Sequence, residues 1–202
     1  MTAADSSEPA WISPRVLRTK AHVLTVARTL LAELGPVALT YTRLGEAAGV
    51  TRQTLYRHWP TRQILLRDVV ISAPHAPAPV PGTDPAAEVF AFLTTLRSGM
   101  NTQSTAAALM TLASSAPHDS TSSGALIAIT DARRAALNIM LSNTGQHVTA
   151  AQFARLCGPV IFQSLIARAE VTDAFIRSLI AAWQQENSDQ TSPASAQAHD
   201  GR

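Results

Sequence analysis

The sequence is poor in cysteine, aromatic residues and long apolar runs, and each shortage excludes a class of protein. Cys157 is the single cysteine among 202 residues, so no intramolecular disulfide can form, which fits a reducing compartment. Aromatic residues make up 5% and hydrophobic residues 46%, which favours packed helices over an aromatic-rich β-sandwich. The apolar run at residues 156–167 is too short to span a bilayer, and the amino terminus lacks a secretory signal. We therefore expect a soluble, cytoplasmic, all-α protein with no membrane partner.

Residue patterns typical of enzymes and metal sites are also missing. The six histidines are scattered and form neither an HExxH motif nor a His/Cys pair with zinc spacing. The sequence has no Gly-rich phosphate loop and no nucleophile elbow. We expect no catalytic residues, no metal and no cofactor, with an active site built from dispersed residues as the alternative. Cys157 has apolar neighbours, which is more typical of buried packing than of a redox sensor.

The net charge of +2 is unevenly distributed along the chain. Residues 13–71 hold nine basic and three acidic residues, whereas residues 72–202 hold seven basic and nine acidic ones. A basic surface of this kind suits a polyanionic partner, because counter-ions are released when cations neutralise phosphates. The first third of the chain is therefore the candidate region for contact with nucleic acid.

Hydrophobic periodicity and helix-breaking residues divide the chain into two helical regions. Five prolines in SAPHAPAPVPGTDP, residues 72–85, forbid a continuous helix there. Asp84 as N-cap and Pro85 as first helical residue then start the second region, in which Gly158-Pro159 should kink or split a helix. The predicted organisation is a disordered tail (1–14), a first domain (15–71), a Pro-rich connection (72–84), a second helical domain (85–187) and a disordered tail (188–202).

Residues 39–62, LTYTRLGEAAGVTRQTLYRHWPTR, have the pattern of a helix-turn-helix. Leu44, Ala48, Val50 and Leu55 are spaced to hold two short helices together. Gly49 stands where the chain must turn, since glycine adopts a left-handed conformation without steric cost. Thr40 and Thr51 precede the two helices and are good N-caps. An ordinary helical hairpin is the alternative, but the combination of spacing, glycine and two caps argues against it.

The second helix of this motif is rich in hydrogen-bond donors. It presents Arg52, Gln53, Thr54, Tyr56, Arg57 and His58, and it contains no acidic residue. Donors without acids are what a helix facing phosphates and base edges requires. The sequence therefore predicts that this helix reads the major groove of double-stranded DNA.

The segment from about residue 18 to residue 70 resembles the amino-terminal domain of TetR-family transcriptional regulators. The resemblance is carried by the apolar stripe of the first helix, by the TxxxLxxxAGVTxxTLYRHW run from Thr40 to Trp59, and by Arg62. It implies an all-α fold, in which a three-helix DNA-binding domain precedes a helical ligand-binding and dimerisation domain. Gly45 departs from the family pattern, in which alanine is more usual, and Trp59 replaces the usual phenylalanine.

The resemblance also implies roles for residues of this sequence. By position, Thr42, Thr51, Tyr56, His58 and Arg62 would contact phosphates, and Arg52, Gln53 and Thr54 are candidates for base readout. Arg43 and Arg57 complete the predicted DNA-binding set. The family implies a homodimer, with a small-molecule inducer that releases it from DNA.

Apolar and polar residues of the second region are candidates for a ligand pocket, although each of them fits a plain core as well. They are Phe90, Leu93, Arg97, Met100, Leu109, Met110, Ile129, Arg133, Met140 and Phe162. Low charge and abundant Leu, Met and Phe favour an apolar or amphipathic inducer. Arg134, Asn138 and Gln163 are further polar groups that either orient a ligand or face solvent.

The apolar stripes of the last two predicted helices favour a two-fold helix-bundle interface over a monomer surface. The predicted interface consists of Val160, Ile161, Leu165, Phe175, Ile176, Leu179, Ile180 and Trp183. Together these features indicate a dimeric, ligand-responsive repressor that binds a palindromic operator. Activation of transcription shares every sequence feature. A small-molecule-binding helical protein or enzyme with a vestigial helix-turn-helix is the alternative from another class.

Overall fold

The computed structural model describes residues 14–72 and 78–191, and these parts of the chain form helices and contain no strand. The predicted all-α fold is thereby confirmed. In chain order the elements are α1 (Pro14–Leu34), the 3-10 helix η1 (Pro36–Ala38), α2 (Tyr41–Ala48), α3 (Arg52–His58), α4 (Arg62–Ile71), α5 (Pro85–Met100), α6 (Gln103–Ser115), α7 (Ser120–Met140), α8 (Ala150–Ile161), the π-helix η2 (Phe162–Ala167) and α9 (Asp173–Thr191).

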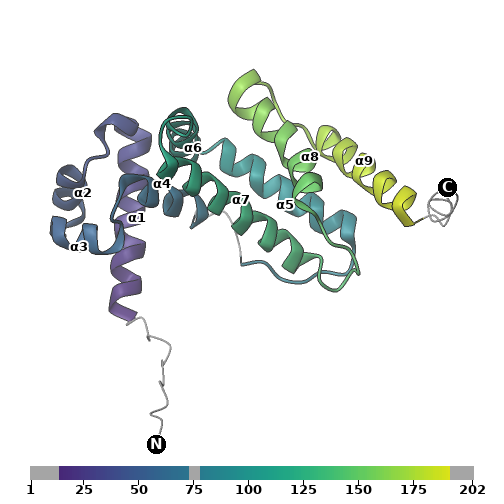
Figure 1. Cartoon of the computed structure of the whole chain (residues 1–202), viewed down its shortest axis with the longest axis horizontal. Coiled ribbons are helices and arrows are strands. Elements are labelled where there is room, and N and C mark those ends of the chain that lie inside the picture. Colours follow the sequence, from purple (N-terminus) through teal and green to yellow (C-terminus); the bar gives the residue numbers. More distant parts are fainter. Residues whose placement is uncertain (1–13, 73–77, 192–202) are drawn as a thin grey trace, which may run out of the picture.

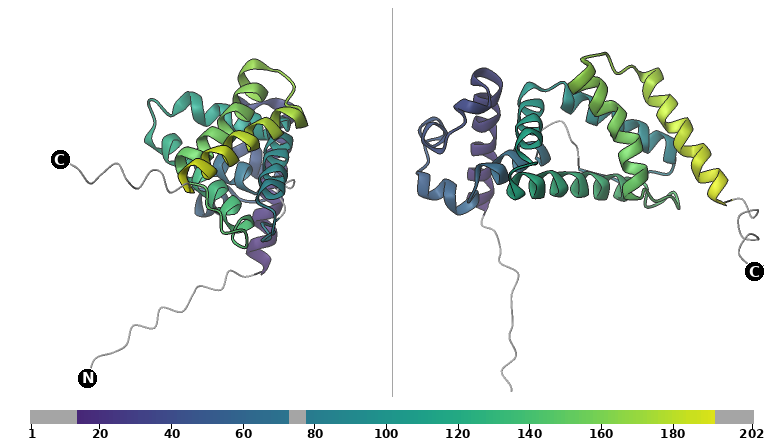
Figure 2. Two further views of the ribbon diagram at one scale, coloured as in Figure 1. Left: turned by 90° about the vertical axis from the view of Figure 1, so that its right-hand side faces the viewer. Right: turned by 45° about the horizontal axis from the view of Figure 1, so that its top comes forward.

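The molecule is elongated, and two groups of helices lie at its opposite ends. Helices α1 to α4 form one end, α6 and the start of α7 lie beside them, and α5, α8 and α9 form the other end (Figure 1). The right-hand view of Figure 2 shows the same separation of α1 to α4 from α8 and α9. A surface at the first end is therefore far from α9.

Most helices begin directly after a residue whose side chain caps them. Thr40, Thr51, Thr61, Asp84 and Thr149 each accept a hydrogen bond from a backbone N–H two or three residues further on. Each cap satisfies a donor that the first turn of a helix leaves without a partner. The helix starts predicted at Thr40, Thr51 and Asp84 are confirmed.

The buried apolar residues form two cores, and the first crosses the predicted domain boundary. Alongside residues of α1 to α4, it contains Ala108 and Leu112 of α6 and Ala125 and Ile129 of α7. The second core joins α5, the end of α7, α8 and α9. The two helices that follow α5 therefore complete the core of the amino-terminal half, which gives that half a rigid attachment to the rest of the chain.

Helix α8 changes its winding after Pro159, where the sequence predicts a kink or a split. Proline cannot donate the hydrogen bond of a regular helix and crowds the carbonyl one turn earlier. The chain continues as the six-residue π-helix η2 and ends in Arg168, whose φ of 53° is left-handed. Helix and π-helix together, Ala150–Ala167, are long and apolar enough to cross a membrane, with a mean hydropathy of 1.2. Because α5 and α9 pack against α8, we interpret it as an amphipathic core helix.

Two predicted boundaries are corrected by the structure. Pro14, placed in the amino-terminal tail, is the first residue of α1, and the last helix extends to Thr191 although the second domain was expected to end at residue 187. The predictions for residues 1–13 and 192–202, and for residues 73–77 of the Pro-rich connection, lie outside the described residues.

Candidate nucleic-acid interface and small-molecule cavity

The turn between α2 and α3 depends on two glycines with different roles. Gly49 caps α2 with a φ of 64°, the left-handed conformation predicted from the sequence. Gly45 lies inside α2, where an added Cβ would stand 2.8 Å from the carbonyl oxygen of Val50. The Val50 N–H donates to the Gly45 carbonyl at 3.0 Å. Glycine at residue 45, where the family usually has alanine, therefore lets the turn lie close to α2.

Helix α3 rests on a rigid apolar base. Leu44 and Leu55 are fully buried, and Trp59 is 1% exposed. The Trp59 indole N–H donates to Oδ2 of Asp68 on α4 at 2.9 Å, and the Tyr41 hydroxyl donates to the Trp59 carbonyl. Trp59 is thus buried at the position where the family usually has phenylalanine. Its hydrogen bonds also connect the end of α3 to α4 and α2.

The outward face of α3 carries most of the predicted DNA-binding residues. Thr42, Arg43, Thr51, Arg52, Gln53, Tyr56 and Arg57 are exposed, and Thr54 and His58 are half-buried. The Thr54 hydroxyl lies 3.0 Å from that of Thr51, whose oxygen also caps α3. Base readout by Thr54 would therefore compete with this local bond, whereas Arg52 and Gln53 are free to reach outward.

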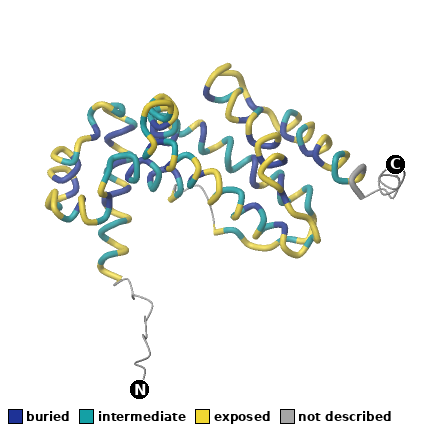
Figure 3. The backbone as a smooth tube through the Cα atoms, in the orientation of Figure 1, coloured by how far each residue is buried: buried dark blue, intermediate teal, exposed yellow. Residues whose placement is uncertain are grey.

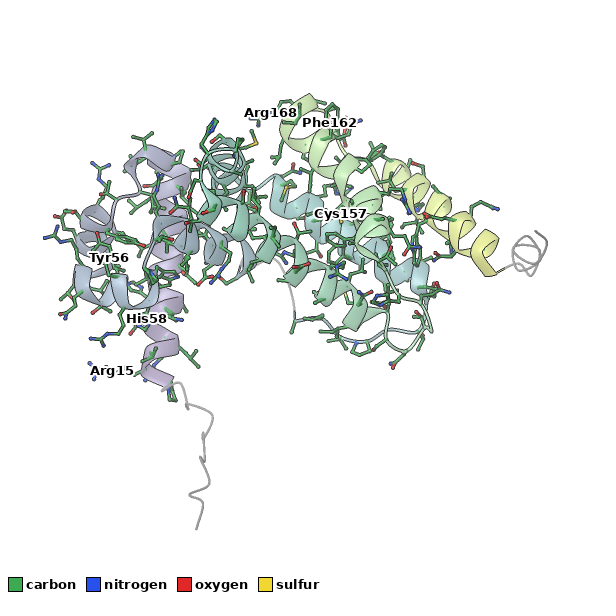
Figure 4. The ribbon with its side chains drawn as sticks, in the orientation of Figure 1. Arg15, Tyr56, His58, Cys157, Phe162 and Arg168 are labelled. Atoms are coloured by element: carbon green, nitrogen blue, oxygen red, sulfur yellow. The ribbon has the colours of Figure 1, made fainter. Side chains whose placement is uncertain are left out.

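The end of α3 lies beside a basic part of α1 that the motif does not include. Burial is the main cause that lowers the pKa of His58, and the positive charges of Lys20 and Arg57 lower it further. Arg15 and Arg18, on the same end of α1, are exposed. Tyr56, His58 and Arg15 lie along the outer edge of the molecule, at the end opposite α9 (Figure 4). The charge count pointed to this region, but only the fold brings α1 to the end of α3.

Arg62, for which the sequence predicts a phosphate contact, makes a hydrogen bond within the protein. Its Nη2 donates to the carbonyl of Pro36, so it joins the start of α4 to η1, and burial lowers its pKa. A guanidinium held in this way is a structural bond between two segments of the amino-terminal domain. The phosphate contact of Arg62 stays a prediction, and the bond to Pro36 would compete with it.

A cavity of about 360 Å³ lies where the two halves of the molecule meet. Its lining comes from α4 to α8 and η2 and is almost wholly apolar, with contributions from Val70, Phe92, Leu96, Leu126, Phe153 and Cys157. Phe92 and Phe153 make an edge-to-face contact at 5.9 Å between ring centroids. Burial raises the pKa of the Cys157 thiol to about 12, so it is protonated at neutral pH. Apolar volume of this size is typical of a small-molecule site.

Half of the predicted pocket residues line this cavity. Met100, Leu109, Met110, Ile129 and Arg133 do so. Phe90 instead packs against the second core under Arg177, and Leu93 and Met140 belong to that core. Arg97 binds Asp173 and the Val171 carbonyl, and Phe162 is exposed. These five predictions are corrected, because the rotation of each helix directs their side chains elsewhere.

Most residues of the predicted dimer interface lie inside the protomer. Val160, Leu165, Ile176, Ile180 and Trp183 are buried, and Phe175 and Leu179 pack against the second core. Ile161 is exposed at 37%. The outward faces of α8 and α9 carry other residues and are marked as exposed along their length (Figure 3). The apolar stripes therefore pack the two helices onto α5 and against each other, and a second copy would meet a different face.

Comparison with known proteins links this architecture to one family. Residues 23–69 match the family described as bacterial regulatory proteins, tetR family. TetR family transcription regulator SCO0332 superposes with a TM-score of 0.63 and 25% identity, over 87% of this chain and all of its own. A TetR transcriptional regulator from Rhodococcus sp. RHA1 gives 0.61 and 19% identity, over 88% and 99%. The multidrug binding protein EbrR, complexed with imidazole, gives 0.53 and 11%, over 81% and 93%. None of the curated proteins matches the chain in sequence.

Proposed function

We propose that this chain, which has the DNA-binding domain and the whole fold of TetR-family regulators, is a homodimeric transcriptional repressor that a small molecule releases from a palindromic operator. One observation carries the proposal. The exposed face of α3 presents Arg52, Gln53, Tyr56 and Arg57 without an acidic neighbour on that helix, above the buried side chain of Leu55. Such a face supplies donors for phosphates and base edges on a well-packed apolar support.

The cavity supports the ligand-responsive part of the proposal. It touches α4 at Val70, and α4 directly follows the recognition helix α3. Dimeric readers of this kind need half-sites about one helical turn apart, roughly 34–36 Å, or a multiple of it. A ligand that favours another separation of the two α3 helices lowers DNA affinity by its differential affinity for the two states.

A two-fold dimer of this chain would use the outward faces of the last two helices. Ala151, Ala154 and Gly158 of α8 are exposed on one face, as are Ala174 and Ser178 of α9. Small residues at this spacing let two helices approach closely, and a second copy is the partner with which such faces repeat by symmetry. Like other DNA-binding regulators of its fold, the protein would act in the cytoplasm, with double-stranded DNA as its partner.

Selection of bound sequences from a random duplex pool at near-physiological salt tests the proposal. A palindromic consensus is the expected result, because each protomer reads one half-site. If Arg52 makes a bidentate contact with guanine, Arg52→Ala should weaken the binding free energy for that consensus by about 1–3 kcal/mol. Its affinity for random DNA should change little. Equal losses on both DNAs would contradict a base-reading role. No enrichment of any sequence would contradict the regulator and favour a small-molecule-binding protein with a vestigial motif.

A further inference from the structure

The cavity contains one charged side chain. Arg133 of α7 is the sole ionisable lining residue besides Cys157, and the lining includes no aspartate or glutamate. The other polar residues are threonines, and those at 95 and 130 already donate to the carbonyls of Ala91 and Leu126. A ligand in this cavity therefore meets an apolar wall and one cation.

Arg133 is half-buried, and it makes few hydrogen bonds for a guanidinium with five donors. Its Nη2 donates to the Val70 carbonyl at 2.8 Å, and among the described residues no carboxylate lies within ion-pair distance of it. Burial lowers its pKa, but arginine keeps its charge in proteins, so the guanidinium remains a partly desolvated cation. A charge in such surroundings is stabilised by an anion that brings two acceptor oxygens.

The bond from Arg133 reaches the last turn of α4, which a second arginine also holds. Arg28 of α1 donates to the carbonyls of Val69 at 3.3 Å and Ser72 at 2.6 Å. The end of α4 is thus bound by one arginine from the DNA-binding half and by one from the cavity wall. A ligand that takes the donors of Arg133 removes the bond from Arg133 to Val70 and leaves the bonds that Arg28 makes.

A second hollow adjoins the cavity. It shares Met100, Met110 and Leu165 with the cavity and ends at Arg168, again with no acidic residue in its lining. Arg168 follows the last residue of η2, and in Figure 4 it lies on the side of η2 that faces α6. Positive charges at the mouth and in the interior favour the entry of a negatively charged compound.

We propose that the cavity binds an amphipathic carboxylate, whose apolar part lies between Phe92, Phe153 and Ile129 and whose carboxylate pairs with Arg133. The carboxylate replaces the Val70 carbonyl as the acceptor of Arg133, which frees the end of α4 from the cavity wall. Binding itself does not depend on the DNA-related role, whereas release from the operator rests on the proposed function.

Calorimetric titration of the full chain with octanoate and with octan-1-ol tests the inference, since the two probes share one chain and differ in charge. The wild-type protein should bind octanoate about tenfold more tightly than the alcohol, the smallest preference expected from a charge-assisted hydrogen bond. Arg133→Gln keeps a donor for Val70 but has no charge, and should reduce the preference to about twofold or less. Arg133→Lys, which keeps the charge, should retain part of it.

Two matched variants locate the effect. Arg134→Gln removes a charge from the next residue of α7, which does not line the cavity, and should leave the preference unchanged. Arg168→Gln removes the charge at the mouth and should affect the rate of binding more than the affinity. A preference that survives in Arg133→Gln but disappears in Arg168→Gln would overturn the assignment to Arg133.

The ratio of the wild-type affinities for octanoate and octan-1-ol is measured without any variant. It therefore tests the inference even where a substitution prevents folding. Equal affinity for the two probes, tighter binding of the alcohol, or no saturable binding of octanoate would each overturn the inference. Operator binding is measured separately, by displacement with each probe at equal occupancy. Carboxylate binding through Arg133 without any DNA binding would leave the cavity assignment standing and contradict the proposed function. Release by both probes alike would contradict the role of the Arg133–Val70 bond.

Discussion

The recognition helix and the cavity wall both carry arginine, but in opposite surroundings. Arg52 and Arg57 stand exposed on α3, over a buried leucine. Arg133 stands in an apolar cavity, where burial lowers its pKa and one carbonyl is its hydrogen-bond acceptor. The exposed arginines suit a long polyanion whose many contacts are individually weak, whereas the buried one suits a single small anion. All three residues are arginines, so the difference in partner follows from how far each guanidinium is exposed to solvent.

The two regions are connected by packing as well as by this bond. The first core extends from α1 through α4 into α6 and α7, and α4, α6 and α7 also line the cavity. A change at the cavity therefore acts on helices that support the DNA-binding motif, and the following predictions test how separate the two regions are.

The largest effect is expected from shortening a buried leucine of α6. Leu112 is 0% exposed and belongs to the first core, so Leu112→Ala should lower the free energy of unfolding by about 2–5 kcal/mol. Hydrogen exchange of the α2 and α3 amides should quicken, because this helix completes their core. Leu137→Ala is the control, being equally buried but in the second core. Equal quickening in α2 and α3 with both variants would show one cooperative unit instead of two.

Replacing a helical glycine by alanine should destabilise the protein at one position and stabilise it at another. Gly45→Ala places a Cβ 2.8 Å from the Val50 carbonyl, which cannot move without opening the turn, and should cost about 1–3 kcal/mol. Gly124 of α7 has nothing within 4 Å of an added Cβ, and Gly124→Ala should stabilise by about 0.5–1 kcal/mol. Thermal unfolding resolves both, at about 2–4 °C per kcal/mol for a chain of this size. A neutral or raised Tm for Gly45→Ala would mean that the α2–α3 turn relaxes freely.

Arg57 and Arg62 separate a DNA contact from a structural bond. Arg57→Gln should weaken binding to any duplex and reduce the slope of log affinity against log salt by about 1, since one phosphate contact is lost. Arg62→Gln should leave that slope unchanged and destabilise the fold by on the order of 1 kcal/mol, through the bond to Pro36. The same fall in slope for Arg62→Gln would support the phosphate contact that the sequence predicts.

The smallest effect concerns the protonation of His58. Burial and the positive charges of Lys20 and Arg57 lower its pKa in the free protein, which favours the neutral ring. A phosphate beside the ring favours the protonated form, so the pKa is higher in the complex and a proton is taken up on binding. Operator affinity should therefore rise as the pH falls from about 7.5 to about 6, by no more than about fivefold, because exposed ion pairs contribute about 1 kcal/mol or less. His58→Gln should abolish the rise, and an unchanged rise in that variant would place the titrating group elsewhere.

The helix-turn-helix was predictable because its determinants are local. The caps Thr40 and Thr51, the left-handed Gly49 and the buried Leu44 and Leu55 lie close together in the sequence and were all identified from it. Arg62 is the exception in this region. Its acceptor, Pro36, lies 26 residues away, and no spacing rule indicates that contact.

The cavity was predictable in composition but not in its residues. Periodicity places Phe90 and Phe92 on the same predicted helix, yet Phe92 lines the cavity and Phe90 packs under Arg177. The choice depends on the rotation of α5 against α8 and α9, and on residues more than sixty positions away. In the same way, the apolar residues of the last two helices fit either a core or an interface until their neighbours are known.

By itself the sequence determined the all-α fold, the DNA-reading motif and the basic charge of the amino-terminal third, since periodicity, caps and charge act over a few residues of chain. Only the tertiary structure decided which arginine faces solvent, which one stands in the cavity and which one joins two segments. It also decided that α6 and α7 complete the core beneath the DNA-binding helices. These outcomes depend on contacts between residues distant in the chain, because burial and desolvation are properties of the packed molecule and not of any segment.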